Sequence, residues 1–127
     1  IILGDHGTNL TEHGIYFSSC SLFDETIHAP FIAHLPGLGQ KETDNFVQNT
    51  DIAPTILDLI GEKQDDNFDG KSLTAADQDR DKVFFWDGLA EDIRGERTKN
   101  NKVIIAKGRK CHLCKSSHHQ EQEEYNY

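Results

Sequence analysis

The first seven residues constrain the fold of this chain most, because an apolar run stops abruptly at a charged pair. Ile1–Leu3 is followed by residues 4–7, which read Gly-Asp-His-Gly. An apolar run that ends in Gly-Asp is typical of a buried parallel strand that delivers polar side chains to a site at its C-terminal end. We therefore predict that residues 1–4 are the tail of an interior strand whose sheet neighbours lie outside this sequence.

The composition limits the classes of function that this chain can serve. Of its 127 residues, 35% are hydrophobic and 28% are charged, which leaves room for one domain with a modest core. The net charge of -9 would repel the phosphates of nucleic acid and the head groups of an anionic membrane. No apolar run approaches the roughly 20 residues that span a bilayer, and three cysteines do not suggest a disulfide framework.

The clearest periodic element is a helix predicted over residues 51–60. Thr50 or Asp51 is a suitable cap for its start, and Gly61 suits the position after its end. Four apolar residues fall on one helical stripe: Ile52, Ile56, Leu59 and Ile60. We expect this stripe to pack against a sheet.

Shorter apolar runs predict strands at residues 31–33, 83–86 and 102–107. The last two flank the basic stretch 94–99, which favours a small antiparallel subdomain. Residues 108–127 are charged, rich in histidine and without periodicity, so we interpret them as a polar tail.

Asp5 and His6 form a candidate metal-binding pair. The change from strand to loop breaks the alternation of side-chain faces, so both side chains can turn toward one cation. Aspartate offers a hard oxygen and a neutral imidazole offers a nitrogen, while Gly7 lets the backbone bend without a Cβ clash. The competing interpretation is a hydrogen-bonded polar pair on a loop, without a metal.

Several motifs then follow one another along the chain. Residues 4–14 read GDHGTNLTEHG, residues 22–32 read LFDETIHAPFI, residues 50–61 read TDIAPTILDLIG and residues 69–73 read DGKSL. In order and spacing they resemble the C-terminal half of the catalytic domain of the sulfatase family, within the alkaline-phosphatase-like superfamily. Residues 94–99 resemble the family's RTxRYK strand, and residues 123–127 resemble the ELYDL segment that often follows it.

The resemblance implies an α/β fold: the C-terminal fragment of an alkaline-phosphatase-like mixed sheet sandwiched by helices, followed by a small antiparallel β subdomain. It assigns residues 1–75 to the catalytic domain and residues 82–127 to the subdomain with its polar tail. The implied function is metal-dependent hydrolysis of a sulfuric ester, with a small anionic substrate such as a sulfated sugar or an aryl sulfate. Phosphodiester or phosphonate hydrolysis in the same superfamily is the alternative.

By the same resemblance, Asp5 and His6 match ligands of a divalent cation. Calcium is the expected ion. Many members have Asn where this chain has His6, and an imidazole nitrogen suits calcium less well than an amide oxygen, so manganese and zinc stay open. His13 matches the histidine of the family's GEHG motif and is expected to hydrogen-bond the substrate or orient a ligand; a loop histidine that only packs fits equally well. Asp24 or Glu25, which match the YDExxxxP motif, are expected to pair with a nearby base.

Ser19 departs from the family pattern. It stands eleven residues before Pro30, where the family commonly has a Lys or His that touches the sulfate, and a hydroxyl neither neutralises an anion nor readily protonates a leaving group. Arg94 is expected to line the outer pocket and favour an anionic substrate, unless it is only a surface charge on a strand. Cys20 is interpreted as a small buried thiol.

The family's nucleophile is absent from this sequence. Sulfatases carry it in a C/S-x-P-x-R motif, where it is converted to formylglycine, and neither this motif nor the paired aspartates of the family's metal site occur here. We therefore expect formylglycine in an N-terminal half outside this sequence, and no turnover by the chain alone. The rival hypothesis is a non-catalytic remnant that keeps the second half of the fold.

A candidate zinc site lies in the tail. Cys111, Cys114 and His118 form a C-x2-C-x3-H arrangement, which suits zinc ligation by thiolates and an imidazole. No second CxxC completes the set at standard spacing, so a flexible polar tail is the alternative.

Overall fold

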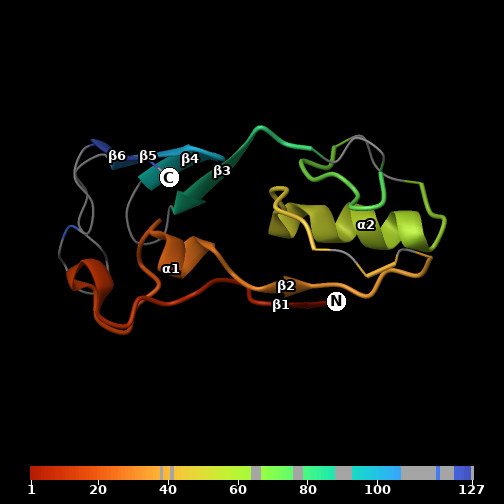
Figure 1. Cartoon of the computed structure of the whole chain (residues 1–127), viewed down its shortest axis with the longest axis horizontal. Helices are drawn as coiled ribbons and strands as arrows, with labels where there is room; N and C mark the ends of the chain where they lie inside the picture. Colours follow the sequence, from red (N-terminus) through yellow and green to blue (C-terminus); the bar gives the residue numbers. More distant parts are fainter. Residues whose placement is uncertain are drawn as a thin grey trace. The chain divides into compact units, whose positions relative to one another are not determined.

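A computed structural model describes residues 1–37, 39–40, 42–63, 67–75, 79–87, 93–106, 117 and 122–126 (Figure 1). They belong to two compact units: the first is Ile1–Ile32 with Lys82–Tyr127, and the second is Ala33–Asp81. The division at residues 75 and 82 expected from the sequence concerns the domains of the whole protein and stays a prediction. None of the helices described here has the length and apolarity needed to cross a membrane.

The first unit begins with a two-stranded sheet. Strand β1 (Ile2–Leu3) pairs antiparallel with β2 (Phe31–Ile32), and the backbone N–H of Gly4 continues the pairing by donating to the carbonyl of Pro30 at 3.0 Å. Both strands were predicted, but the expectation that the strand neighbours of residues 1–4 lie outside this sequence is wrong at β2, which is antiparallel to β1 and not parallel. Ile2 is 72% exposed in this chain. The apolar run therefore predicts a strand correctly but does not identify the strand that lies beside it.

A four-stranded antiparallel sheet completes the first unit. Its strands, in spatial order, are β3 (Lys82–Asp87), β4 (Ile93–Thr98), β5 (Asn101–Ala106) and β6 (Gln122–Asn126). This confirms the small antiparallel sheet. The interpretation of residues 108–127 as a polar tail is wrong at β6, which pairs with β5 along an edge of the sheet. The strand was missed because Tyr125 is its only strongly apolar side chain, so it shows no apolar alternation.

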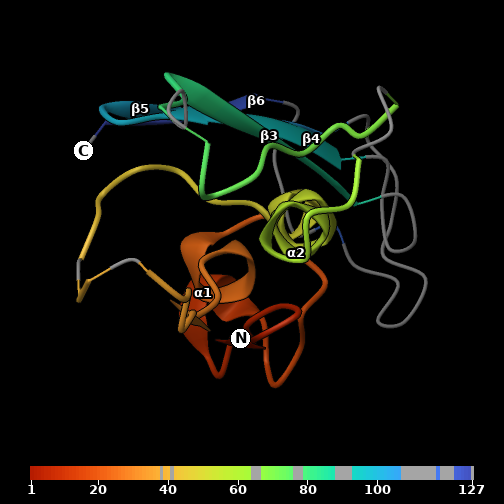
Figure 2. The same ribbon diagram turned by 90° about the vertical axis from the view of Figure 1, so that its right-hand side faces the viewer.

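Alternation of side chains along these strands gives the sheet one buried face. Ile93 and Ile104 on this face are fully buried, and Phe23 packs beneath them just before the short helix α1 (Asp24–Ile27). The complete buried cluster is Ile15, Leu22, Phe23, Ile93, Ile104 and Ala106. In both views, helix α1 lies on the side of the four-stranded sheet that carries this buried cluster (Figure 1 and Figure 2).

The second unit contains the predicted helix. A 3-10 turn, η2 (Asn49–Asp51), leads into α2 (Ile52–Leu59), and Gly61 follows with φ +74°. A positive φ is the conformation that favours glycine after a helix end. The carboxylate of Asp51 accepts the backbone N–H of Gln48 at 2.8 Å, which caps the start of the turn.

The expected burial of the apolar stripe on α2 is wrong within this unit. Ile56 is 44% exposed and Ile60 is 65% exposed, whereas Thr55 is fully buried. The hydroxyl of Thr55 donates to the carbonyl of Asp51 at 2.6 Å and accepts the N–H of Leu73 at 2.9 Å. Polar contacts with the following loop thus decide which face of α2 this unit buries, and helical periodicity does not report such contacts.

Candidate functional site

Asp5 and His6 lie just after β1, and their side chains face each other. Nε2 of His6 is 3.8 Å from Oδ2 of Asp5, and the backbone N–H of His6 donates to Oδ1 of Asp5 at 3.0 Å. The side chains of His6 and Asp5 are 54% and 89% exposed, so an ion from solvent can reach both. The two groups meet as the sequence indicated, and their role as metal ligands stays a prediction.

A backbone carbonyl sets the orientation of the His6 ring. Nδ1 of His6 lies 2.8 Å from the carbonyl oxygen of Gly7. A carbonyl oxygen only accepts, so Nδ1 carries the proton of this hydrogen bond. In the neutral imidazole this leaves the lone pair on Nε2, the nitrogen that faces Asp5.

The spacing of these two groups fits ligands of one divalent ion. Metal–ligand bonds to oxygen or nitrogen are about 2.0–2.6 Å long, so two ligands of one ion lie at most about 5 Å apart. The separation of 3.8 Å between Nε2 of His6 and Oδ2 of Asp5 is within this limit. The described residues contain no cluster of three or more His, Cys, Asp or Glu side chains suited to holding a metal. Asp5 and His6 alone could therefore supply only part of the ligands of an ion, and their role as ligands stays a prediction.

Gly7 packs directly against helix α1. Its backbone N–H donates to the carbonyl of Thr26 at 2.7 Å. A Cβ at this position would overlap the carbonyl oxygen of Glu25. Only glycine allows this approach, so the residue after His6 is fixed by contact with α1.

We predict that Gly7→Ala lowers the free energy of unfolding by about 1–3 kcal/mol, because the added methyl group must push α1 and the loop apart. Gly4→Ala is the matched control on the other side of the pair, since its Cβ would lie 3.3 Å from Ala29 Cβ and Pro30 Cδ. Denaturant unfolding of the protein measures both variants. An equal cost for the two variants would contradict the assigned packing of Gly7.

Asn9 holds the following loop in place, and sequence reasoning missed it. This residue is fully buried, and its Nδ2 donates to Ser21 Oγ at 2.8 Å and to Thr26 Oγ1 at 2.7 Å. Asn9 and Ser18 also form a β-bridge, with N···O distances of 2.9 and 3.1 Å. Asn in a loop rich in Gly and Thr is ordinary composition, so the local sequence gave no signal for this role.

His13 packs within the first unit. It lies in the 3-10 turn η1 (Glu12–Gly14) with φ +56°, and its ring stacks on Phe23 with 3.6 Å between ring centroids. Its Nε2 is 3.3 Å from Oε2 of Glu25, so Glu25 has a basic partner as expected. These contacts agree with the packing interpretation of His13, and its contact with substrate stays a prediction.

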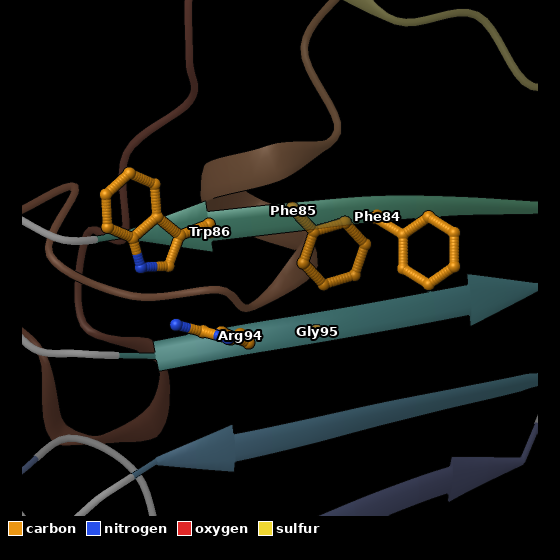
Figure 3. A pocket seen from close by; sticks show the side chains of 5 residues that line it. All are labelled: Phe84, Phe85, Trp86, Arg94 and Gly95. Atoms are coloured by element: carbon orange, nitrogen blue, oxygen red, sulfur yellow. The ribbon is translucent and has the colours of Figure 1, made fainter. Parts of the chain in front are cut away.

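Arg94 and Ser19 are each found on a segment other than the strand that precedes Asp5. Arg94 lies on β4 opposite Trp86, and both line a surface hollow of about 450 Å³ together with Phe84, Phe85 and Gly95 (Figure 3). Asp5, in contrast, follows a strand of the two-stranded sheet. The carbonyl of Ser19 accepts the N–H of Ser21 at 2.9 Å. Substrate contact by Arg94 or Ser19 stays a prediction.

The cysteines divide into two groups. Cys20 is buried, with 7% of its surface exposed, as the sequence indicated. The candidate zinc ligands Cys111, Cys114 and His118 lie outside the described residues.

Comparisons with known proteins agree with one another. The family model described as "N-sulphoglucosamine sulphohydrolase, C-terminal" matches residues 11–89. Arylsulfatase K of Canis lupus familiaris is 30% identical over 87 residues, and the extracellular sulfatase SULF-1 homolog of Drosophila melanogaster is 31% identical over 74 residues. A solved structure described as a complex with its substrate, D-glucosamine-2-N,6-O-disulfate, is similar with a TM-score of 0.77 and 25% identity.

These matches cover much of this chain but a small part of each relative. The match to arylsulfatase K covers 68% of this chain and 15% of the relative, and the match to the SULF-1 homolog covers 58% and 7%. The solved structure matches 98% of this chain over 26% of its own length. The activity of a whole protein therefore does not follow from these matches alone.

Proposed function

This chain belongs to the sulfatase family and corresponds to a C-terminal portion of its members, and on that premise we propose that it supplies one corner of a metal-dependent active site for sulfate-ester hydrolysis. The family and the α/β fold class predicted from the sequence are confirmed. The metal, the reaction and the substrate are the proposal.

The observation that carries the proposal is the orientation of the Asp5–His6 pair. The Gly7 carbonyl directs Nε2 of His6 toward the carboxylate of Asp5, at a distance that suits two ligands of one ion. Carboxylate oxygen favours calcium, and the imidazole also admits manganese or zinc. When bound, such an ion would polarise a substrate oxygen and keep a nearby nucleophile in its reactive form.

The chain's own residues supply positioning and not the nucleophile. Gly7, held against α1, fixes the backbone beside His6, so the backbone that carries the two proposed ligands is set before an ion binds. The nucleophile, a formylglycine by resemblance, is expected in an N-terminal half of the protein. We therefore expect no turnover by this chain alone.

The proposed substrate is a small sulfate ester, either a sulfated sugar or an aryl sulfate. Support for the sugar comes from the similar solved structure, which is described with a disulfated glucosamine as its substrate. A phosphodiester is the competing substrate class, because the same superfamily resemblance admits it.

We predict that the whole protein hydrolyses p-nitrophenyl sulfate, loses this activity when a chelator removes divalent ions, and regains it with calcium, manganese or zinc. Bis-p-nitrophenyl phosphate serves as the parallel substrate. Release of p-nitrophenol measures turnover of both esters. Undiminished turnover after complete metal removal would refute the metal corner, and faster turnover of the phosphodiester would replace the substrate class. No turnover of either ester or of a sulfated glucosamine would favour the remnant hypothesis.

A further inference from the structure

Three charged side chains from distant parts of the chain meet in the first unit. Oδ1 of Asp24 accepts the ammonium group of Lys102 at 2.7 Å, and Oδ2 of Asp24 accepts Nη1 of Arg97 at 2.5 Å. The two bases lie 78 and 73 residues further along the chain. One carboxylate at the start of α1 thus binds both β4 and β5.

Burial is uneven within this cluster, and Lys102 is its most buried member. The side chain of Lys102 is only 2% exposed, and that of Asp24 is 30% exposed. Burial lowers the pKa of Lys102, and the hydrogen bond that Lys102 donates to Asp24 opposes this change. Burial raises the pKa of Asp24, but hydrogen bonds from Lys102 and Arg97 outweigh it and hold that pKa below its usual value.

Such a cluster is better suited to fixing geometry than to adding stability. Replacing a buried ion pair by apolar residues is often neutral or stabilising, because the desolvation of the charges offsets their attraction. Directional hydrogen bonds from two bases to the two oxygens of Asp24 nevertheless fix the carboxylate relative to the sheet. Helix α1, which begins at Asp24, is fixed with it.

Contacts of α1 lead from this cluster to the Asp5–His6 pair. Two residues after Asp24, the carbonyl of Thr26 accepts the N–H of Gly7, and the hydroxyl of Thr26 accepts Nδ2 of Asn9. Gly7 has no room to move toward α1, since even a methyl group would overlap the carbonyl of Glu25. A displacement of α1 is therefore passed to the backbone beside the two proposed ligands.

We propose that Lys102 and Arg97 are positioning residues for the Asp5–His6 metal corner, acting through Asp24 and α1. This inference rests on the proposed metal role of that corner. It gives the antiparallel sheet a function in the site, because β4 and β5 hold the helix that sets the position of Gly7.

The test is the affinity of the whole protein for Mn²⁺, titrated at a temperature well below its Tm and followed by electron paramagnetic resonance. The double variant Asp24→Asn/Lys102→Met removes the charge of Asp24 together with that of the buried Lys102, and the Arg97 side chain that loses its carboxylate partner is 22% exposed. We expect it to weaken Mn²⁺ binding about tenfold, the lower end of losses seen when partners of metal ligands are removed. Lys82→Met is the matched control, because it breaks an exposed ion pair to Glu96 in the same sheet and is expected to leave the Kd unchanged.

Asp5→Ala, measured alongside, separates the two ideas. If Asp5→Ala leaves the Kd for Mn²⁺ unchanged, the proposed metal corner itself fails. If Asp5→Ala weakens binding and the double variant does not, only the positioning role fails, even where the Tm of the double variant falls. Should the double variant not fold, Lys102→Met alone keeps the pair between Asp24 and Arg97 and is expected to weaken binding by less than the double variant; an unchanged Kd in this variant overturns the inference.

Discussion

Replacing Asp5 by alanine is expected to lower kcat/KM of the whole protein for an aryl sulfate by about 10³-fold. Loss of a metal ligand removes charge stabilisation of the transition state worth several kcal/mol, and about 4 kcal/mol corresponds to about 10³ in rate. The Asp5 side chain is 89% exposed, so the free energy of unfolding should change by less than about 0.5 kcal/mol. Steady-state kinetics with excess metal, together with denaturant unfolding, measure the two effects separately.

Two comparisons at His6 identify the ion. If calcium is bound, His6→Asn supplies an oxygen ligand and should retain more activity than His6→Ala. If zinc or manganese is bound, loss of the imidazole should make the two variants similarly poor in activity.

Asp44→Ala is the control for Asp5→Ala, because it changes an exposed carboxylate of the second unit and should leave kcat/KM unaltered. Activity of Asp5→Ala equal to that of Asp44→Ala would show that Asp5 holds no ion needed for turnover.

Local sequence patterns were sufficient to predict an element where neighbours along the chain decide its structure. Helix α2 was predicted within two residues because a cap, a helical period and Gly61 agree on its ends. Strands β3 and β5 were predicted because aromatic and β-branched residues cluster there. The Asp5–His6 pair was found for a similar reason: its two members are adjacent, so a break in strand geometry is enough to bring them together.

Contacts between distant residues were not predictable from local patterns. The sequence suggested that Asp24 or Glu25 pairs with a base, but it did not point to Lys102, 78 residues away from Asp24. The same holds for Arg80, which lies 29 residues beyond its partner Asp51. Charged residues of both signs are frequent in this chain, so composition permits many pairings, and only the folded backbone selects among them.

Asp51→Ala is expected to lower the free energy of unfolding by about 3–5 kcal/mol, the usual cost of removing one partner from a buried ion pair. Asp51 is fully buried and forms two hydrogen bonds with Arg80, one of them 2.5 Å from Nη2 to Oδ1. It also accepts the backbone N–H groups of Gln48 and Lys71 at 2.8 Å. The variant would leave the Arg80 side chain, which is only 12% exposed, without this carboxylate. Urea unfolding gives the magnitude, and Asp79→Ala, which removes an exposed hydrogen bond to Asn45, should cost less than about 1 kcal/mol.

The contribution of Asp51 to the free energy of unfolding should also decrease as the pH falls. Burial raises the pKa of Asp51, but hydrogen bonds from Arg80 and from two backbone amides outweigh it, so that the folded-state pKa lies below the usual value. The unfolded chain, with an Asp pKa of about 3.9, then binds the proton more readily than the folded protein in acid. The stabilisation by Asp51 is complete at pH values above the unfolded-state pKa and is lost as the pH falls through the lower folded-state pKa. The difference in unfolding free energy between the wild type and Asp51→Asn should therefore shrink from about pH 6 to about pH 2.5, and a constant difference over this range would contradict an ionised, hydrogen-bonded Asp51.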